Sequence, residues 1–213
     1  NVYEYDVVQA PLFISMPFLG ELVEGRRPIP HSLESVCGKI SEADAWGLLV
    51  KIASGLAFLH REGVIHCNIK PSNIFYIVEG GEVDVRIGDV SLGWLGGVHR
   101  MDLDKLLIHL APEQIESPRE IFEGAGLRWD VYGFGVLAYQ LITGRPPRCA
   151  GYVEEARQEQ DPNGVGLPFV LDTQHFMGKL VDQEVIQWPG KASSPGDVRR
   201  RAVIERCLKI DSK

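Results

Sequence analysis

The residues whose chemistry could matter most lie in one short stretch, Val64–Ile74, which reads V-I-H-C-N-I-K-P-S-N-I. Asn68 carries an amide with no titratable proton acceptor at ordinary pH, so it can orient a group but cannot act as a base. Cys67 could be read as a nucleophile, but no neighbouring side chain supplies a base in a suitable geometry. We therefore expect Cys67 to be a buried, inert thiol.

The same stretch resembles the catalytic loop of eukaryotic-type serine/threonine protein kinases, V-I-H-R-D-x-K-P-x-N-I. Cys67 and Asn68 stand where that family has Arg and Asp. In the family the Asp accepts the proton of the substrate hydroxyl and orients this nucleophile. The resemblance thus implies the frame of a phosphotransferase without its base.

Four further segments follow in kinase order. They are I-G-D-V-S-L at 87–92, A-P-E at 111–113, D-V-Y-G-F-G-V-L at 130–137 and C-L-K-I-D at 207–211. They are similar to the metal-binding segment, the end of the activation segment, the buried helix that supports the catalytic loop, and the segment before the last helix. Together these landmarks imply an α+β, protein-kinase-like fold: a predominantly helical C-lobe with a remnant of the N-lobe sheet.

Two domains are expected from this resemblance. Residues 1–20 are similar to the last two strands and the hinge of a kinase N-lobe, and residues 21–213 to a C-lobe truncated before its last helix. No Gly-rich phosphate loop, strand lysine or helix carrying its glutamate partner is found. We therefore expect either part of a longer protein or a C-lobe module that stands alone.

The resemblance also assigns the nucleotide-binding positions. Met16 matches the gatekeeper, the Pro17 carbonyl and the Leu19 amide match the groups that bind adenine, and Phe75 is expected beside them.

Asn73 and Asp89 match the two Mg²⁺ ligands, because hard oxygen ligands are what that ion needs. The alternative is that Asn73 only hydrogen-bonds the loop backbone and that Asp89 is a turn residue. Lys70 stands where serine/threonine kinases hold a lysine against the transferred phosphate.

Three residues are expected to be structural. His66 fills a buried position in the family, and Asp130 accepts backbone amide hydrogens from the loop around His66 and Cys67. Glu113 lacks the arginine that pairs with it in the family, since the chain stops a few residues short of it.

The activation segment supports the same interpretation. After Ser91 and as far as Glu113 it contains no Ser, Thr or Tyr. Activation by phosphorylation needs an acceptor hydroxyl and an arginine to receive the phosphate, and Cys67 replaces that arginine. The threonine that precedes A-P-E in serine/threonine kinases is also missing. The apolar side chains of the segment predict a loop docked on the core.

These losses predict a pseudokinase, a protein-binding or scaffolding module in signalling with little or no phosphotransfer. No cofactor is required, and ATP with Mg²⁺ is expected to bind weakly if at all. One alternative is an atypical active serine/threonine kinase whose Gly-rich loop and lysine lie outside this segment. Another is a C-lobe interaction domain that stands alone.

The elements that must position these residues show in the hydrophobic pattern. Strands are expected at 2–9 and 11–19, with Pro17 ending regular pairing, and a hairpin at 73–78 and 83–88. Ser41 and Asp44 predict the start of a helix that Gly63 closes. Two more helices are expected: one over 129–143, and a last one capped by Asp197 and running to Leu208. Between 151 and 196 we expect helical pieces joined by long loops.

The amino-acid composition restricts the kinds of partner and the cellular location that we expect for this protein. A chain of 213 residues, 45% hydrophobic, can bury one good core. Its net charge of −7 argues against nucleic-acid or membrane partners and leaves other proteins as the expected partners. The run Arg199–Arg201 is expected to be a solvated helix face. The four cysteines show no C-x-x-C pairing, and neither a signal peptide nor a membrane-spanning run is visible, so a cytoplasmic location is expected.

Overall fold

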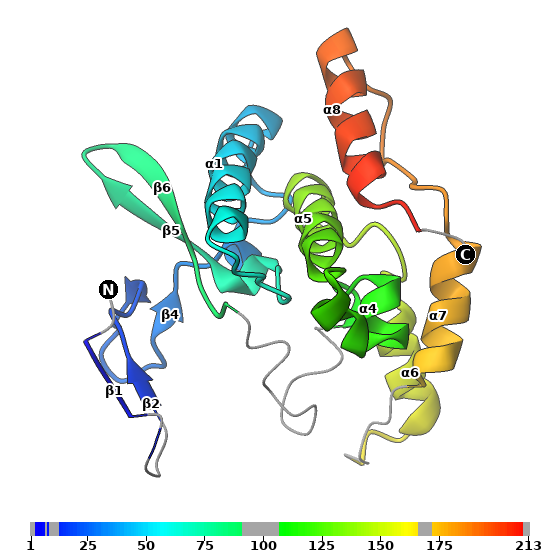
Figure 1. Ribbon diagram of the computed structural model, residues 1–213, viewed down its shortest axis with the longest axis horizontal. Coiled ribbons are helices and arrows are strands. Elements are labelled where there is room, and N and C mark those ends of the chain that lie inside the picture. Colours follow the sequence, from blue (N-terminus) through cyan, green and yellow to red (C-terminus); the bar gives the residue numbers. More distant parts are fainter. Residues whose placement is uncertain (1–2, 7, 9–12, 91–106, 166–171, 211–213) are drawn as a thin grey trace.

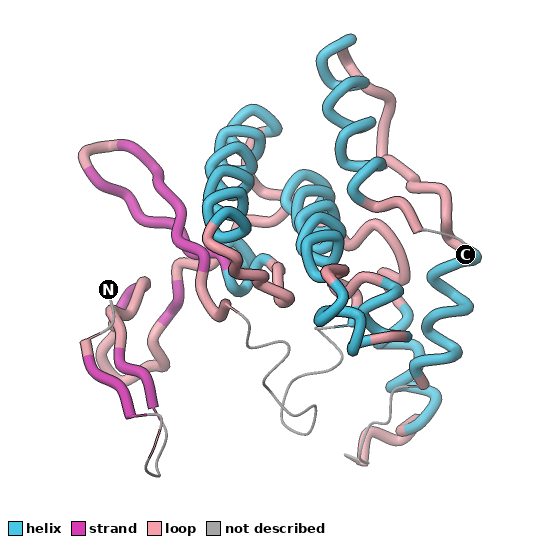
Figure 2. Tube along the Cα trace, in the orientation of Figure 1, coloured by secondary structure: helices cyan, strands magenta, loops and turns pink. Residues whose placement is uncertain are grey.

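A computed structural model describes residues 3–6, 8, 13–90, 107–165 and 172–210. These residues form a mostly helical body with small two-stranded antiparallel sheets at the amino-terminal side, the α+β class that the sequence predicts (Figure 1; Figure 2 shows helices and strands by colour). The strands are β1 (Glu4–Asp6), β2 (Phe13–Ser15), β3 (Gly20–Glu21), β4 (Ile29–Pro30), β5 (Ile74–Glu79) and β6 (Glu82–Ile87). The α-helices are α1 (Glu42–Arg61), α4 (Pro112–Glu116), α5 (Gly126–Thr143), α6 (Tyr152–Gln160), α7 (Thr173–Asp182) and α8 (Pro195–Cys207), with short 3-10 helices at Leu33–Ser35, Pro71–Asn73 and Pro118–Glu123.

The two expected amino-terminal strands are present but short. β1 pairs antiparallel with β2, with Tyr5 opposite Ile14. Pairing ends at Ser15, shortly before Pro17, as expected for a residue without an amide hydrogen. Beyond β4, the His31 amide donates to the Leu19 carbonyl at 3.0 Å. This hydrogen bond holds the end of the amino-terminal segment, at His31, against its earlier part at Leu19.

The predicted hairpin is β5–β6, with Val78 opposite Val83. Gly80 and Gly81 make the turn with φ of 60° and 86°, values that glycine adopts without steric cost. The Tyr76 amide donates to the His31 carbonyl at 2.9 Å, so the outer edge of β5 holds the end of the amino-terminal segment.

Helix α1 begins and ends where the sequence predicts. The Ser41 hydroxyl accepts the Asp44 amide at 3.1 Å, and Gly63, at φ 72°, follows the last turn. Its inward positions Ala45, Leu49, Ile52 and Leu56 are buried. They pack in the main core with α5 and the end of α8. The buried residues of the 64–74 loop belong to the same core, so α1 supports this loop.

Helix α5 is the centre of that core. It begins at Gly126, ahead of the predicted Trp129, and ends as predicted at Gly144 with φ 78°. Gly38 lies so close to this end that an added Cβ would stand 2.6 Å from the Gly144 Cα, and its amide donates to the Leu141 carbonyl at 2.9 Å. Only glycine fits that approach.

Two expectations about the last helix need correction. Ser194, not Asp197, is the cap of α8: its backbone is extended, and its hydroxyl accepts the Asp197 amide at 3.1 Å. Asp197 lies inside the first turn, where its negative charge suits the helix dipole. The run Arg199–Arg201 is a solvated face only in part, because Arg199 and Arg200 are exposed and Arg201 is partly buried; Arg200 and Arg201 also contact tryptophan rings. They lie 5.5 and 4.7 Å from the ring centroids of Trp46 and Trp188 respectively, a cation–π geometry.

The remaining expectations for this region hold. Helices α6 and α7 are the helical pieces predicted between 151 and 196. All four cysteines are free thiols. Within the residues that the structure describes, we find no helix of the length and apolar character needed to cross a bilayer.

Candidate functional site

Asp130 anchors the loop that carries the candidate site. Its carboxylate accepts the His66 amide at 2.8 Å and the Cys67 amide at 2.7 Å, the contacts expected from the sequence. His60, in the last turn of α1, also places its Nε2 2.8 Å from the same carboxylate. Asp130 is 1% exposed. One buried carboxylate near the start of α5 thus joins α1, α5 and the loop through charge-assisted hydrogen bonds.

His66 is fully engaged and has a structural position. Its Nε2 donates to the Gly88 carbonyl at 2.9 Å, and its Nδ1 accepts the Asn68 amide at 3.2 Å. Burial lowers the pKa of His66 below its usual value, so the ring is held neutral. With both nitrogens occupied, His66 links the loop to the segment before Asp89 and has no free atom for proton transfer.

Cys67 can neither bind a regulatory phosphate, as the arginine at this position does in the family, nor act as a nucleophile. It is 4% exposed, and burial, aided by the neighbouring Asp130 charge, raises the pKa of its thiol to about 12. Its φ of 61° is uncommon for a residue with a side chain. Gln114, in α4, donates from Nε2 to the Cys67 carbonyl at 3.0 Å. A neutral amide contact therefore ties α4 to the loop at this point.

Asn68 is the chemically decisive residue of the loop. It is 4% exposed, and its Oδ1 is a buried acceptor that has no hydrogen-bond partner among the described residues. Its backbone carbonyl accepts Nδ2 of Asn73 at 2.9 Å. Its side chain can accept a hydrogen bond from a hydroxyl, but an amide does not take up the proton.

The two residues expected to hold Mg²⁺ are brought together. The Gly88 amide donates to the Asn73 carbonyl at 2.8 Å, which places Asp89 next to Asn73. The Nδ2 of Asn73 donates to the Asn68 carbonyl of the loop, so its Oδ1 is the side-chain atom that can bind another partner. Asp89 is exposed and has a φ of 55°.

Two hard oxygen donors of this kind fit a Mg²⁺ ion that also takes phosphate oxygens. In the part of the chain that the structure describes, no cluster of three or more His, Cys, Asp or Glu could hold a metal by itself.

The adenine-side residues are less well assembled. Met16 is 56% exposed and Pro17 is exposed, while the Leu19 carbonyl is used by His31. Phe75 does lie in the site, because its ring would be 2.9 Å from a Cβ added at Gly88. The structure thus joins Phe75 to the Asp89 segment and leaves Met16 and Pro17 open to solvent.

Three parts of the expected site remain to be placed: Lys70, Glu113 and the activation segment. Lys70 is partly buried and precedes the short helix Pro71–Asn73, and its ammonium group has no hydrogen bond or ion pair to the described residues. Glu113 is half-buried and forms no ion pair within the described residues. Most of the segment that the sequence predicts to dock on the core, residues 91–106, lies outside the described residues. At its described end Leu107 is buried, and Ile108 and Leu110 are partly buried against the same small core cluster, as expected for a docked segment.

Sequence reasoning missed His60, Gln114 and Arg148, which all act through tertiary contacts. Arg148 is 5% exposed; its Nε and Nη2 each donate over 2.8 Å, to the carbonyls of Gln183 and Glu184 at the end of α7. A cation at the carboxyl end of a helix is favoured by the dipole. The only local signal for His60 was a histidine ending an apolar helix.

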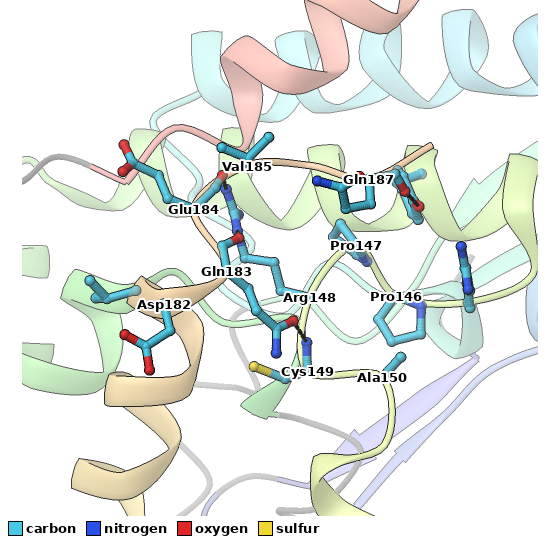
Figure 3. Close-up of a pocket in the computed structure, with 13 residues that line it drawn as sticks. Pro146, Pro147, Arg148, Cys149, Ala150, Asp182, Gln183, Glu184, Val185 and Gln187 are labelled. Carbon is cyan, nitrogen blue, oxygen red and sulfur yellow. Dashed lines mark hydrogen bonds between the residues drawn. The ribbon is translucent and has the colours of Figure 1, made fainter. Parts of the chain in front are cut away.

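Arg148 lines a cavity of about 580 Å³ between the 145–150 and 181–187 segments, shown in Figure 3. Cys149, beside it, has its amide bonded to Gln183 Oε1 at 2.9 Å, and burial raises the pKa of its thiol to about 11. This cavity lies at the carboxyl end of α5, whereas Asp130 is near the amino end, about 20 Å away along the helix. It is therefore separate from the catalytic-loop site.

Comparison with known proteins defines the class. Residues 5–212 match the family model of the protein kinase domain. The chain belongs to the protein kinase family, and its α+β fold is protein-kinase-like.

Some relatives are named as serine/threonine-protein kinases and one is named as an inactive kinase. The chain is 31% identical over 135 residues to serine/threonine-protein kinase PkaA of Streptomyces coelicolor, covering 62% of this chain and 24% of the relative. It is 32% identical over 124 residues to serine/threonine-protein kinase DCLK1 of Rattus norvegicus, covering 57% and 28%. It is 30% identical over 137 residues to inactive serine/threonine-protein kinase PLK5 of Mus musculus, covering 62% and 21%. The chain thus spans less than a third of the length of these relatives.

Proposed function

We propose that this domain is a pseudokinase, a protein-binding or scaffolding module with little or no phosphotransfer. The observation that carries the proposal is Asn68. It occupies the position of the family's base, and its side-chain oxygen is a buried amide acceptor that cannot take a proton. The relative named as inactive supports the proposal as a precedent within the family.

The surroundings of Asn68 support the same conclusion. Where the family holds an arginine that receives a regulatory phosphate, Cys67 has a neutral, buried thiol. The loop is instead fastened by Asp130 and Gln114. A loop held by permanent contacts does not need phosphorylation to be positioned, which suits a domain that presents one fixed surface to a partner.

Nucleotide binding in this proposal is weak. Residues 1–20 supply the end of an N-lobe, with Met16, Pro17 and Leu19 on the adenine side, and residues 21–213 supply the C-lobe with Phe75, Asn73 and Asp89. Lys70 keeps the position near the phosphates. Because Met16 and Pro17 are exposed, this half of the pocket excludes little water. ATP with Mg²⁺ would have to be held mainly through its phosphates, and the partners of the domain would be proteins at a cytoplasmic location.

A phosphotransfer assay tests the proposal. The full-length protein is incubated with labelled ATP, Mg²⁺ and a generic protein substrate, beside the variants Asp89→Ala and Asn68→Asp. We expect no incorporation by the wild type. Incorporation by the wild type that Asp89→Ala abolishes would refute the proposal.

One observation favours a second candidate, an atypical active serine/threonine kinase whose Gly-rich loop and lysine lie outside this segment. Asn73 and Asp89 are both kept and lie together, and two of the relatives above are named as kinases. If that candidate is right, a Mg²⁺-dependent thermal shift with ATP should be large in the full-length protein, as expected for ligand far above its Kd. A C-lobe module that stands alone would show no shift.

A further inference from the structure

The outward face of α1 carries large apolar side chains that the described residues leave exposed. Val50 is 64% exposed and Phe58 is 54% exposed. They share this face with Ala43, Gly47 and other small side chains, and its exposed charged residues are Asp44, Lys51 and Arg61. A surface helix normally carries polar residues opposite its buried face, so two large exposed apolar side chains there are candidates for contact with another molecule. The helix lies between α5 and the β5–β6 hairpin in Figure 1.

A groove runs beside this face. A cavity of about 510 Å³ lies between α1, the segment before it and the hairpin. Its lining is mostly apolar: Leu33, Val36, Ile40, Ala43, Asp44, Gly47, Leu48, Lys51, Tyr76 and Val83. Asp44 and Lys51 are the charged members of this lining.

We propose that this face binds a second copy of the chain, with the two α1 helices packed antiparallel about a two-fold axis near Gly47. In such an interface the same patch serves on both subunits, so each contact occurs twice. The patch must therefore be complementary to itself, and the positions of its charged and large apolar residues meet that requirement.

The positions of the charged residues are compatible with a two-fold axis. Asp44 and Lys51 are two turns apart on the same side of α1, and Gly47 lies between them. When the helices are antiparallel about Gly47, Asp44 of each copy lies beside Lys51 of the other. Lys51 donates to the Val83 carbonyl, which leaves ammonium hydrogens for a second partner. Both ion pairs would be formed at once.

The apolar residues also match. Phe58 lies about 16 Å beyond Gly47 along the helix. In the antiparallel arrangement this position lies just past the amino end of the other copy's α1, toward Ile40, the apolar lining residue that immediately precedes the Ser41 cap. A Cβ added at Gly47 would meet nothing within 4 Å, so the crossing point is open. Small residues at a helix contact allow a short interaxial distance.

The geometry predicts a selective cross-link. In the full-length protein, Gly47→Cys should form an intermolecular disulfide when copper–phenanthroline oxidises the paired thiols, since residue 47 faces its own counterpart across the axis. Ser54→Cys, on the same exposed face, should not, because it faces the region of Ile40. The unsubstituted protein gives the background from the native cysteines. Equal cross-linking of the two variants, or none above background, would overturn the proposal.

Sedimentation equilibrium gives a second test. Because two single helices bury less area than a standard interface, we expect dissociation in the micromolar range. Val50→Glu should weaken the dimer at least tenfold, whereas the matched change Val198→Glu, at a site 58% exposed on α8, should leave it unchanged. Asp44→Lys and Lys51→Asp should each weaken it, and the double variant should recover it. A protein that stays monomeric up to about 100 µM, or binds only a different protein through Val50, refutes a two-fold dimer.

Discussion

Replacing Asp130 by Ala should be among the most damaging single changes in the domain. The carboxylate is buried and accepts the amides of His66 and Cys67 within 2.8 Å, together with His60. Removing it strands two buried backbone donors, each at about 1–3 kcal/mol. It also breaks a buried charged contact, for which losses of about 3–5 kcal/mol are typical. We expect Asp130→Ala to lower the free energy of unfolding by about 3–5 kcal/mol.

Asn68→Ala is the matched comparison in the same loop. The Asn68 side-chain oxygen has no partner, and its backbone contacts to His66 and Asn73 survive the change. Its removal should therefore cost less than about 1 kcal/mol, because little hydrogen bonding is lost. Asp130→Asn should fall between the two, since an amide can accept one of the two backbone hydrogens but meets the other with a donor.

Urea unfolding followed by circular dichroism measures the three free energies, and the thermal midpoint of Asp130→Ala should fall on the order of 10 °C for a chain of this length. If Asp130→Ala is as stable as the wild type, α5 does not brace the loop. If Asn68→Ala costs as much as Asp130→Ala, the side chain of Asn68 stabilises the loop as strongly as the Asp130 carboxylate does, and the expected difference between the two positions is refuted.

Other perturbations test the packing around the site. Because the pKa of the Cys67 thiol is raised to about 12 from 9.0, the folded state keeps its proton longer than the unfolded state, so stability should fall between pH 9 and 12, and Cys67→Ala should reduce that fall in urea melts. Equal alkaline sensitivity of the two proteins would contradict this. Gly55→Ala should destabilise, because the added Cβ would lie 2.8 Å from Ile87 Cδ1; adding Ile87→Val, which lacks that atom, should recover part of the loss in thermal melts, and no recovery would locate the strain elsewhere. Gln114→Ala should cost about 0.5–1.5 kcal/mol through the lost bond to the Cys67 carbonyl, measured in urea, while Gln114→Glu, which cannot donate, should cost at least as much.

Much of the fold could be predicted because its signals are local. Helix α1 was readable from its cap, its apolar spacing and Gly63, and the β5–β6 hairpin from alternation around Gly80 and Gly81. These features depend on residues within a turn or two of one another. The cap of α8 was misplaced because Ser194 and Asp197 are both good capping residues, and only the backbone conformation decides between them.

Five motifs in kinase order predicted the kinase family from the sequence, and the identity of Asn68 settles the proton chemistry of that one side chain in any conformation. Tertiary structure alone decided which groups this loop depends on. The bonds that support the loop, from His60 to Asp130 and from Gln114 to Cys67, join elements far apart in the chain, and so do the bonds from Arg148 to the end of α7 outside the loop; no periodicity in the sequence predicts them. It also decided that Arg200 and Arg201 lie against tryptophans, and that Asn68 has a buried oxygen with no partner. Burial and hydrogen-bond partnership are properties of the packed molecule, because they depend on which distant atoms exclude water from a group.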